Sequence, residues 1–366
     1  MLQVGIVGLP NVGKSSLFNA LTASGAPAEN YPFCTVDPNV GIVEVPDARL
    51  GRIQELNGSR ESVPTFIRIV DIAGLVRGAS TGEGLGNQFL AQIREVDAIA
   101  HVLRCFDDAD VTHVMGSVDP LRDLEIIETE LALADLDLVE RRREKVEKKA
   151  RSGEKDAIRE LAVLQRILLS LEKGQPLRDL PLSNGDRSIA HALNLLTLKP
   201  VLHVANVGEM EVAGDDSAAL SKIKGKTPGE SGPAVVVPIS LALEAELALL
   251  EPGERREFLT GLGLDEEGSV RVIHAAYHLL GLITFFTANA KQTTAWAIPQ
   301  GTTAPEAAGV IHTDFQKGFI RAEAIGYGEF VELGSMKAAR DKGAIRSEGK
   351  DYVVADGDIL LFRFNL

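Results

Sequence analysis

The chain has 366 residues, of which 45% are hydrophobic, and its formal net charge at pH 7 is −14. This length accommodates two or three domains, and the hydrophobic content is sufficient for buried cores. The acidic charge disfavours nucleic-acid binding by the whole surface, and we expect no DNA partner. Any RNA contact has to come from a local basic patch.

Cysteine content and hydropathy exclude two further classes of protein. Cys34 and Cys105 are too few for a disulfide framework, and the histidines show no metal-ligand spacing with them. The longest apolar stretch, around 279–286, is too short to cross a bilayer, and no signal-like segment precedes the first predicted strand. We therefore expect a cytoplasmic protein with no membrane partner.

A phosphate-binding loop stands near the start of the chain. Residues 8–15 read GLPNVGKS, which matches G-x-x-x-x-G-K-[ST], between a predicted strand at 3–7 and a segment with helical spacing at 16–21. Its glycines allow backbone N–H groups to face phosphates at a helix N-terminus. Lys14 is expected to reach the β- and γ-phosphates, and the Ser15 hydroxyl to bind Mg²⁺. The motif predicts binding of a nucleoside triphosphate, and a glycine turn without ligand is the less favoured alternative.

Three later segments indicate that the loop belongs to a nucleotide switch. Thr35, in a segment rich in proline and aromatic residues, is placed to bind Mg²⁺ and sense the γ-phosphate. Asp71 ends the predicted strand 66–71 and offers Mg²⁺ a carboxylate, with the amide of Gly74 beside the γ-phosphate; a turn or N-cap role is the alternative for Asp71. The glycine-rich segment 75–87 is typical of a loop that triphosphate orders and hydrolysis releases.

The alternation of apolar runs with helical patterns predicts an α/β fold, a parallel sheet covered by helices. The expected strands are 3–7, 66–71, 98–104, 200–206 and 235–239.

A helical insertion is expected between the third and fourth of these strands, at about 124–195. Apolar residues recur at spacings of four, three and four from Ile127 to Leu138, and Ser152 and Gly153 interrupt the pattern, which predicts a coiled-coil-like hairpin. The segment 141–155, near its tip, carries eight basic and three acidic residues. It is either an RNA contact or a solvated helix face whose charges pair four residues apart, and both interpretations remain open.

The loop after the fourth strand bears on base selection. Guanine-specific switches have N-K-x-D here, and the aspartate accepts hydrogen bonds from the guanine N1–H and 2-amino groups. This chain has Asn206, Val207, Gly208 and Glu209 instead. The longer glutamate meets the base differently, so we expect a weakened preference for guanine and ATP binding at least as strong as GTP binding. Ser240, after the fifth strand, fits the remaining loop at the base.

Residues 1–280 are expected to form the nucleotide-binding domain. The last part of the chain, 281–364, is expected to form a separate α+β domain. Its expected elements are strands at 283–287 and around Trp296, a helix at about 305–311, and strands around 319–325, 352–354 and 359–364, the last two joined by the turn 356–358. A strand pair, a helix and a second strand pair suggest a β-grasp fold.

These motifs together resemble the YchF family of Obg-like ATPases, P-loop proteins of the translation-factor class. The resemblance covers essentially the whole chain and rests on Gly8–Ser16, Asn30–Asn39, Asp71–Gln88, His101–Phe106, Asn206–Glu209 and His312–Arg321. It implies an Obg-type nucleotide domain with a helical insertion, a C-terminal TGS domain of β-grasp type, a preference for ATP, and association with ribosomes. Ser16 stands where the loop commonly has threonine, which leaves the Mg²⁺ ligand Ser15 unaffected.

The group that positions the attacking water is the gap in this interpretation. Ras-like enzymes have a glutamine directly after D-x-x-G, whereas this chain has Leu75, which can neither orient nor polarise water. The resemblance places the chain among switches with a hydrophobic residue at this position. The substitutes we consider are a monovalent cation such as K⁺ near Asn11, and His113, for which a surface or capping role is the alternative.

We therefore expect a Mg²⁺-dependent ATPase switch that binds the ribosome or its rRNA through the basic hairpin and the TGS domain. The alternatives are a nucleotide-regulated RNA- or protein-binding module with negligible turnover and, less favoured, a small-molecule kinase. The expected catalytic residues are Lys14, Gly74 and His113, and the expected Mg²⁺ ligands are Ser15, Thr35 and Asp71. The expected nucleotide contacts are Asn11, Val12, Gly13, Lys14, Ser15, Ser16, Asn206, Val207, Glu209 and Ser240.

Overall fold

The computed structural model describes residues 2–23, 39–72, 85–108, 110–212, 218–226, 228–229, 232–233 and 235–365. Thr35 and Gly74 lie outside these ranges, as do Leu75 and most of the glycine-rich segment. The chain groups into two compact units, Leu2–Ile42 with Arg68–Ala276, and Val43–Ile67 with Tyr277–Leu366. Among the described helices, none is both long enough and apolar enough to span a membrane.

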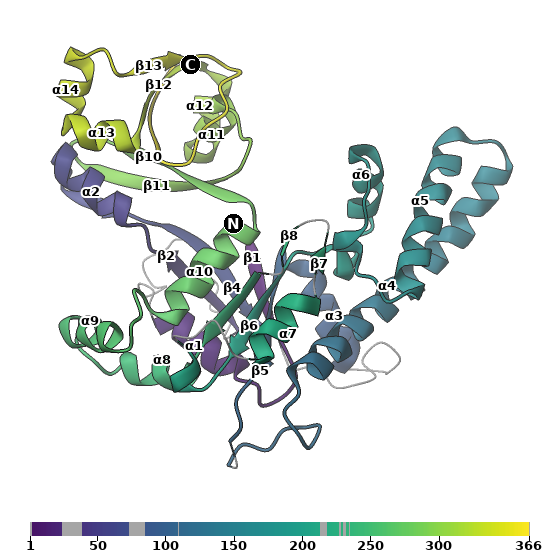
Figure 1. The fold of residues 1–366 in the computed structure, drawn as a ribbon. Coiled ribbons are helices and arrows are strands. Elements are labelled where there is room, and N and C mark those ends of the chain that lie inside the picture. The colour runs from purple at the N-terminus through teal and green to yellow at the C-terminus, as the bar shows by residue number, and fades with distance from the viewer. Residues whose placement is uncertain are drawn as a thin grey trace. The chain divides into compact units, whose positions relative to one another are not determined.

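The first sheet has six strands in the order β2-β4-β1-β5-β6-β9 (Figure 1). These strands are β1 Gln3–Val7, β2 Val40–Val45, β4 Thr65–Asp71, β5 Ala98–Arg104, β6 Val201–Asn206 and β9 Val235–Ile239. From β4 through β1, β5 and β6 to β9 the pairing is parallel. Every residue of β5 is buried, as expected of a central parallel strand with both faces covered. The five predicted strands are confirmed, and β2 is an addition.

The helices and short strands that belong with this sheet follow the same α/β order. They are α1 Lys14–Ala23, α3 Leu85–Glu95, η4 Glu209–Glu211, α7 Ala218–Lys226, β7 Pro228–Gly229, β8 Gly232–Pro233, α8 Leu241–Leu247, α9 Pro252–Gly261 and α10 Gly268–Leu279.

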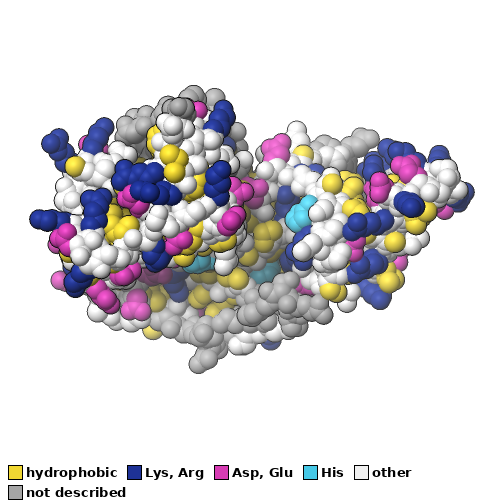
Figure 2. Space-filling view, turned by 90° about the horizontal axis from the view of Figure 1, so that it is seen from above, with side chains coloured by type: hydrophobic (Ala, Val, Ile, Leu, Met, Phe, Trp, Pro, Cys, Tyr) yellow, Lys and Arg dark blue, Asp and Glu magenta, His cyan; other side chains and the backbone are white. Residues whose placement is uncertain are grey.

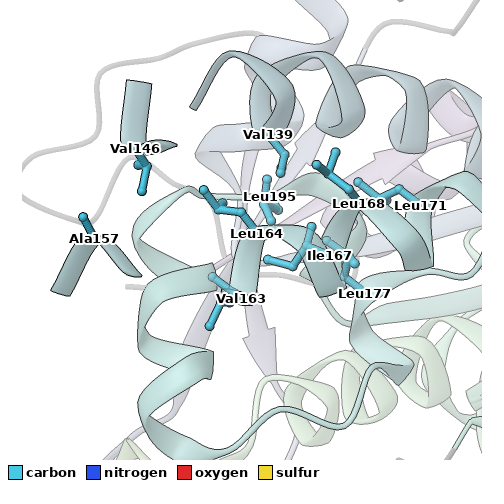
Figure 3. Packing of buried hydrophobic residues seen from close by; sticks show 11 residues of the cluster. Val139, Val146, Ala157, Val163, Leu164, Ile167, Leu168, Leu171, Leu177 and Leu195 are labelled. Atoms are coloured by element: carbon cyan, nitrogen blue, oxygen red, sulfur yellow. The ribbon is translucent and has the colours of Figure 1, made fainter. Parts of the chain in front are cut away.

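The predicted helical hairpin is confirmed as an insertion between β5 and β6. It consists of α4 Pro120–Arg151 and α5 Lys155–Glu172, followed by η2 Leu177–Asp179, α6 Asn184–Ala192 and η3 Leu196–Leu198. Asp119 caps α4 with a proline at the first helical position, and Gly153, at φ 85°, makes the turn into α5. Figure 3 shows side chains such as Val139, Leu164 and Leu195 meeting in its core. The hairpin therefore has a hydrophobic core of its own.

The second sheet has the order β13-β12-β14-β10-β11-β3 and carries the β-grasp arrangement. The hairpin of β10 and β11 is followed by α11 and β12, and β14 returns parallel to β10. The bounds are β10 Leu282–Ala288, β11 Gln292–Pro299, α11 Ala304–Ile311, α12 Thr313–Lys317, β12 Phe319–Gly326, α13 Tyr327–Leu333, α14 Met336–Asp341, β13 Arg346–Glu348 and β14 Asp358–Phe364.

A segment from early in the chain completes this second unit. The strand β3, Glu61–Val63, pairs with β11, and the helix α2, Ala48–Asn57, packs Leu50 and Ile53 against the sheet together with Phe286 and Phe330. On the other face of the sheet, α11 packs against Phe285 in a second hydrophobic cluster, so both faces are covered.

The expected strand at 352–354 is wrong. Val353 makes only an isolated bridge to Thr303, and β13 pairs with β12. Both edges of β14 are already occupied, by β10 and β12, so no position remains for a hairpin partner.

Candidate nucleotide-binding site

A cavity of about 1240 Å³ lies at the carboxyl ends of the parallel strands, the edge at which open α/β sheets bind ligands. Four loops of the larger unit line it. The lining residues are 11–16 of the phosphate loop, 105–108 and Val111 after β5, 206–211 after β6, and 240–242 after β9. The cavity is large enough for a nucleoside triphosphate.

The phosphate loop has the backbone that its sequence predicts. Gly13 has φ 107°, and a Cβ there would lie 2.6 Å from Leu241 Cδ1 and 2.8 Å from Asn206 Nδ2. Lys14 Nζ donates to the carbonyl of Leu9 at 2.9 Å. Burial lowers the pKa of Lys14, and the nearby Asp71 carboxylate opposes this shift. The Lys14 ammonium group thus lies in the loop with few polar neighbours, and an anionic ligand would supply further hydrogen-bond acceptors for it.

Two predicted Mg²⁺ ligands lie next to each other although they are far apart in the sequence. The Ser15 hydroxyl donates to Asp71 Oδ2 at 3.1 Å. A hydroxyl and a carboxylate oxygen are ligands that Mg²⁺ prefers in sites shared with phosphates. In the part of the chain that the structure describes, no cluster of three or more His, Cys, Asp or Glu residues could hold a metal. The donors at Ser15 and Asp71 therefore fit a magnesium ion that is completed by substrate and water.

Asn206 connects two of the loops. Its Nδ2 donates to the carbonyl of Val12 at 3.1 Å, and its Oδ1 accepts the Leu241 N–H at 3.3 Å. Ser240 is buried and accepts the Leu243 N–H as the N-cap of α8. Both predicted residues line the cavity, and these hydrogen bonds fix the shape of its wall.

Val207 and Glu209 differ in how they meet the cavity. Val207 is 2% exposed and packs in a core cluster with Val212 and Leu243. Glu209 is exposed, and within the described residues its side chain makes no hydrogen bond or ion pair. Glu209 is therefore the free carboxylate of this loop.

His113 does not line the cavity. It is buried, its Nδ1 accepts the Met115 N–H at 3.1 Å, and its Nε2 lies 2.8 Å from Asp123 Oδ2. Since Nδ1 accepts, Nε2 carries the proton and donates to Asp123. These contacts tie the loop to the first turn of α4 and give no support to a catalytic role.

The cavity wall after β5 is a part of the site that sequence reasoning missed. Cys105, Phe106, Asp107, Asp108 and Val111 line the cavity. The available signal was their position directly after a predicted central strand, next to the strand that leads into the phosphate loop.

The basic segment of the hairpin separates into paired and unpaired cations. Arg141, Arg142 and Arg151 form ion pairs with Asp137, Glu160 and Glu147. The cations without an ion pair to any described residue are Arg143, Lys145, Lys148, Lys149 and Lys155.

The positions of these unpaired basic residues decide how many of them can contact an anion. Lys145, Lys148 and Lys149 are exposed, and since Lys148 and Lys149 come three and four residues after Lys145, both neighbour it on one side of α4. In Figure 2, where the hairpin lies at the right, Lys and Arg side chains stand on its surface among Asp and Glu. The ion pairs of Arg141, Arg142 and Arg151 fit the solvated helix face, and the RNA contact stays a prediction.

Family models match most of the chain. Residues 3–164 match the family described as 50S ribosome-binding GTPase, and residues 282–365 match the YchF-GTPase_C family, described as a protein of unknown function (DUF933). A protein of Escherichia coli O157:H7 named ribosome-binding ATPase YchF is 51% identical over 364 residues, which cover 100% of this chain and 99% of that protein. The protein of that name in Bacillus subtilis (strain 168) is 50% identical over 368 residues, which cover 100% of both.

Solved structures agree with these relatives. The structure of the Schizosaccharomyces pombe YchF GTPase has a TM-score of 0.88 at 40% identity, and the match covers 99% of this chain and 97% of that one. A GTP binding protein from Pyrococcus horikoshii OT3 has a TM-score of 0.60 at 21% identity over 100% of both chains, a likeness of fold alone. Given these full-length matches and the phosphate loop described above, the chain belongs to the YchF family of P-loop NTPases.

Proposed function

We propose that the chain is a Mg²⁺-dependent, ATP-hydrolysing switch that binds ribosomes in a manner set by its nucleotide. The observation that carries this proposal is the meeting of Lys14, the Ser15–Asp71 pair and the Asn206 loop around one cavity. The relatives named ribosome-binding ATPase, at 51% and 50% identity over their whole length, support it.

The phosphate end of the site has a defined set of roles. Lys14 and the N–H groups of the loop bind the β- and γ-phosphates, and the Gly74 amide donates to the γ-phosphate. Ser15, Thr35 and Asp71 hold Mg²⁺. When bound, the metal neutralises charge that develops on the phosphate oxygens during hydrolysis.

Water positioning is assigned to a monovalent cation such as K⁺ near Asn11. The Asn11 Nδ2 donates to the carbonyl of Thr112 at 3.2 Å, which orients the amide. Its Oδ1 makes no hydrogen bond to any described residue and is a suitable ligand for K⁺. His113 could take part only after releasing Asp123 or Met115.

Base selection is assigned to Glu209, and ATP is the preferred nucleotide. A free carboxylate in the base loop can accept a hydrogen bond from the adenine 6-amino group, whereas the guanine-reading geometry requires the shorter aspartate. Replacing Val207 by lysine would bury an ammonium group at a position that is 2% exposed, so Glu209→Asp alone is the better variant.

The test measures ATP and GTP affinity by calorimetry with Mg²⁺. Wild-type protein is expected to bind ATP at least as tightly as GTP, and Glu209→Asp to shift the ratio toward GTP. Glu246→Asp, at an exposed position on α8, is the matched control and should leave the ratio unchanged. A clear GTP preference of the wild type would contradict the assignment.

The competing proposal is a binding module in which nucleotide only rigidifies the protein. Multiple-turnover release of phosphate from ATP, absent in Lys14→Ala, supports the switch. A wild-type protein that binds ATP and releases no phosphate, with or without ribosomes and K⁺, would favour the module.

A further inference from the structure

Arg104 is the last residue of β5 and is 1% exposed. Its guanidinium donates to three main-chain carbonyls of the loop that follows. These are Phe106 from Nε at 3.1 Å, Val111 from Nη1 at 2.8 Å and Asp108 from Nη2 at 3.2 Å. Its Cζ also lies 4.7 Å from the centroid of the Phe106 ring. No carboxylate forms an ion pair with Arg104 in the described ranges.

Burying a guanidinium without a carboxylate is costly, so its donors have to be satisfied by dipoles. Here the dipoles all belong to one short loop. The planar fork of an arginine can reach several carbonyls at once, which a lysine cannot do. Arg104 therefore fixes the path of this loop more than it serves any other part of the fold.

The loop has little else to hold it. Between the described residues 106 and 112, no main-chain group hydrogen-bonds to another main-chain group. The other hydrogen bonds between described residues here run from the Asp110 N–H to Asp108 Oδ1 at 2.8 Å and from Asn11 Nδ2 to the Thr112 carbonyl at 3.2 Å. Its conformation thus depends mainly on Arg104 at one end and on the phosphate loop at the other.

The same loop faces the base side of the cavity. Arg104 is the register partner of Asn206, and the Cys105 N–H donates to the Asn206 carbonyl at 2.8 Å, so the loop begins beside the base loop. Phe106, Asp108 and Val111 then line the cavity. These three lining residues are the ones whose carbonyls accept hydrogen bonds from Arg104.

We propose that Arg104 is a positioning residue for the nucleoside half of the ligand. It holds residues 105–108, 110 and 111 as a preformed wall for the base and ribose, while the phosphate loop binds the phosphates independently of it. The inference rests on the proposed function, because it takes the ligand to be ATP. A preformed wall favours binding, since no loop ordering then opposes it.

The test compares ATP with inorganic tripolyphosphate, which has the phosphates and lacks the nucleoside. In calorimetry, Arg104→Lys is expected to weaken ATP binding by about tenfold, from the loss of at least one charged hydrogen bond and of loop order. Tripolyphosphate affinity should change by less than about twofold. In turnover, the KM for ATP should rise while kcat stays close to wild type. Arg255→Lys is the matched control, since Arg255 donates to the Leu250 carbonyl and pairs with Glu267 away from the cavity.

A second variant keeps the inference testable if Arg104→Lys does not fold. Asp110 is exposed and does not line the cavity, so Asp110→Gly loosens the loop without touching the arginine. Like Arg104→Lys, it should weaken ATP binding, though by a smaller factor, and it should leave tripolyphosphate binding unchanged. Selective loss of ATP affinity in either variant supports the inference.

Two results would overturn it, and they differ from a failure of the proposed function. If the folded variants bind ATP as the wild type does, or lose ATP and tripolyphosphate equally, Arg104 does not position the nucleoside. If wild-type protein binds neither ligand, the proposed function fails, and the inference fails with it.

Discussion

Gly13 combines a left-handed backbone with a lack of space for a side chain. A Cβ would overlap Leu241 and Asn206, which hold the cavity wall, so Gly13→Ala is expected to weaken ATP binding by about 100-fold or more. Gly153 is the control, because its φ is also positive, at 85°, while nothing lies within 4 Å of a Cβ there. Gly153→Ala should cost about 1 kcal/mol of stability and leave ATP affinity unchanged in calorimetry. Equal effects of the two variants on ATP binding would contradict the claim that the phosphate loop requires glycine at position 13.

Asp135 is a buried carboxylate whose role is structural. It accepts the N–H groups of Leu196 and Thr197 at 2.9 and 2.8 Å and the Thr197 hydroxyl at 2.8 Å, and so joins α4 to the segment before β6. Burial raises its pKa, against these hydrogen bonds. Asp135→Ala leaves buried donors unsatisfied and should lower the free energy of unfolding by about 2–4 kcal/mol.

The exposed Asp137, two residues along the same helix, is the control for Asp135. Among the described residues its side chain pairs with Arg141 alone, on the surface, so Asp137→Ala should change stability by less than about 0.5 kcal/mol in denaturant unfolding. A similar loss in both variants would show that the Asp135 hydrogen bonds are not what stabilises this junction.

His101 of β5 and His203 of β6 are register partners, and their ring centroids are 5.8 Å apart. Burial lowers the pKa of both, that of His203 to about 4. Below about pH 6.5 the unfolded chain binds protons that the folded chain does not, so stability is intact above that pH and falls as the pH drops toward 4. For His203 alone the loss at pH 4 is about 3 kcal/mol.

Unfolding measured between pH 7 and pH 4 tests this pair of strands. His203→Leu should flatten the acid-induced loss of stability, because it removes a group that takes up its proton at a higher pH in the unfolded chain than in the folded chain. His191→Gln, at an exposed position on α6, should leave the profile as in the wild type. An unchanged profile in His203→Leu would assign the acid sensitivity to other groups.

The helical hairpin carries a prediction about salt. Alanine at Lys145, Lys148 and Lys149 should flatten the salt dependence of ribosome co-sedimentation, since each lost phosphate contact removes released counterions. Alanine at Arg141, Arg142 and Arg151 removes the same charge from ion-paired positions and should have a smaller effect. ATP affinity should stay constant in both. Equal effects of the two triple variants would show that pairing within the hairpin does not govern contact with RNA.

For the molecule as a whole, the sequence predicted best what is local or lies in a continuous, mainly apolar run. The strand β5 and the break at Gly153 were predictable because burial on both faces and a left-handed turn leave clear patterns. The Ser15–Asp71 contact was predictable because parallel strands end at one edge of the sheet.

What escaped prediction depends on contacts distant in sequence. The strand Glu61–Val63 has no residue that is fully buried, and it joins a sheet built from residues more than two hundred positions later. In the cavity wall after β5, the carbonyls of Phe106, Asp108 and Val111 accept hydrogen bonds from Arg104, which the sequence shows only as the last residue of a strand. Such features follow from packing and register, which no periodicity in one segment encodes.

The measurement that decides most is ribosome co-sedimentation with ATP, ADP and a non-hydrolysable ATP analogue, using wild-type protein and Lys14→Ala. The account predicts that the fraction bound to ribosomes differs between the analogue and ADP, because the γ-phosphate and Mg²⁺ organise the switch. Lys14→Ala, which lacks the cation between the phosphates, should lose that difference and retain its fold. Ribosome binding by the wild type that is the same with every nucleotide, or no binding at all, would contradict it.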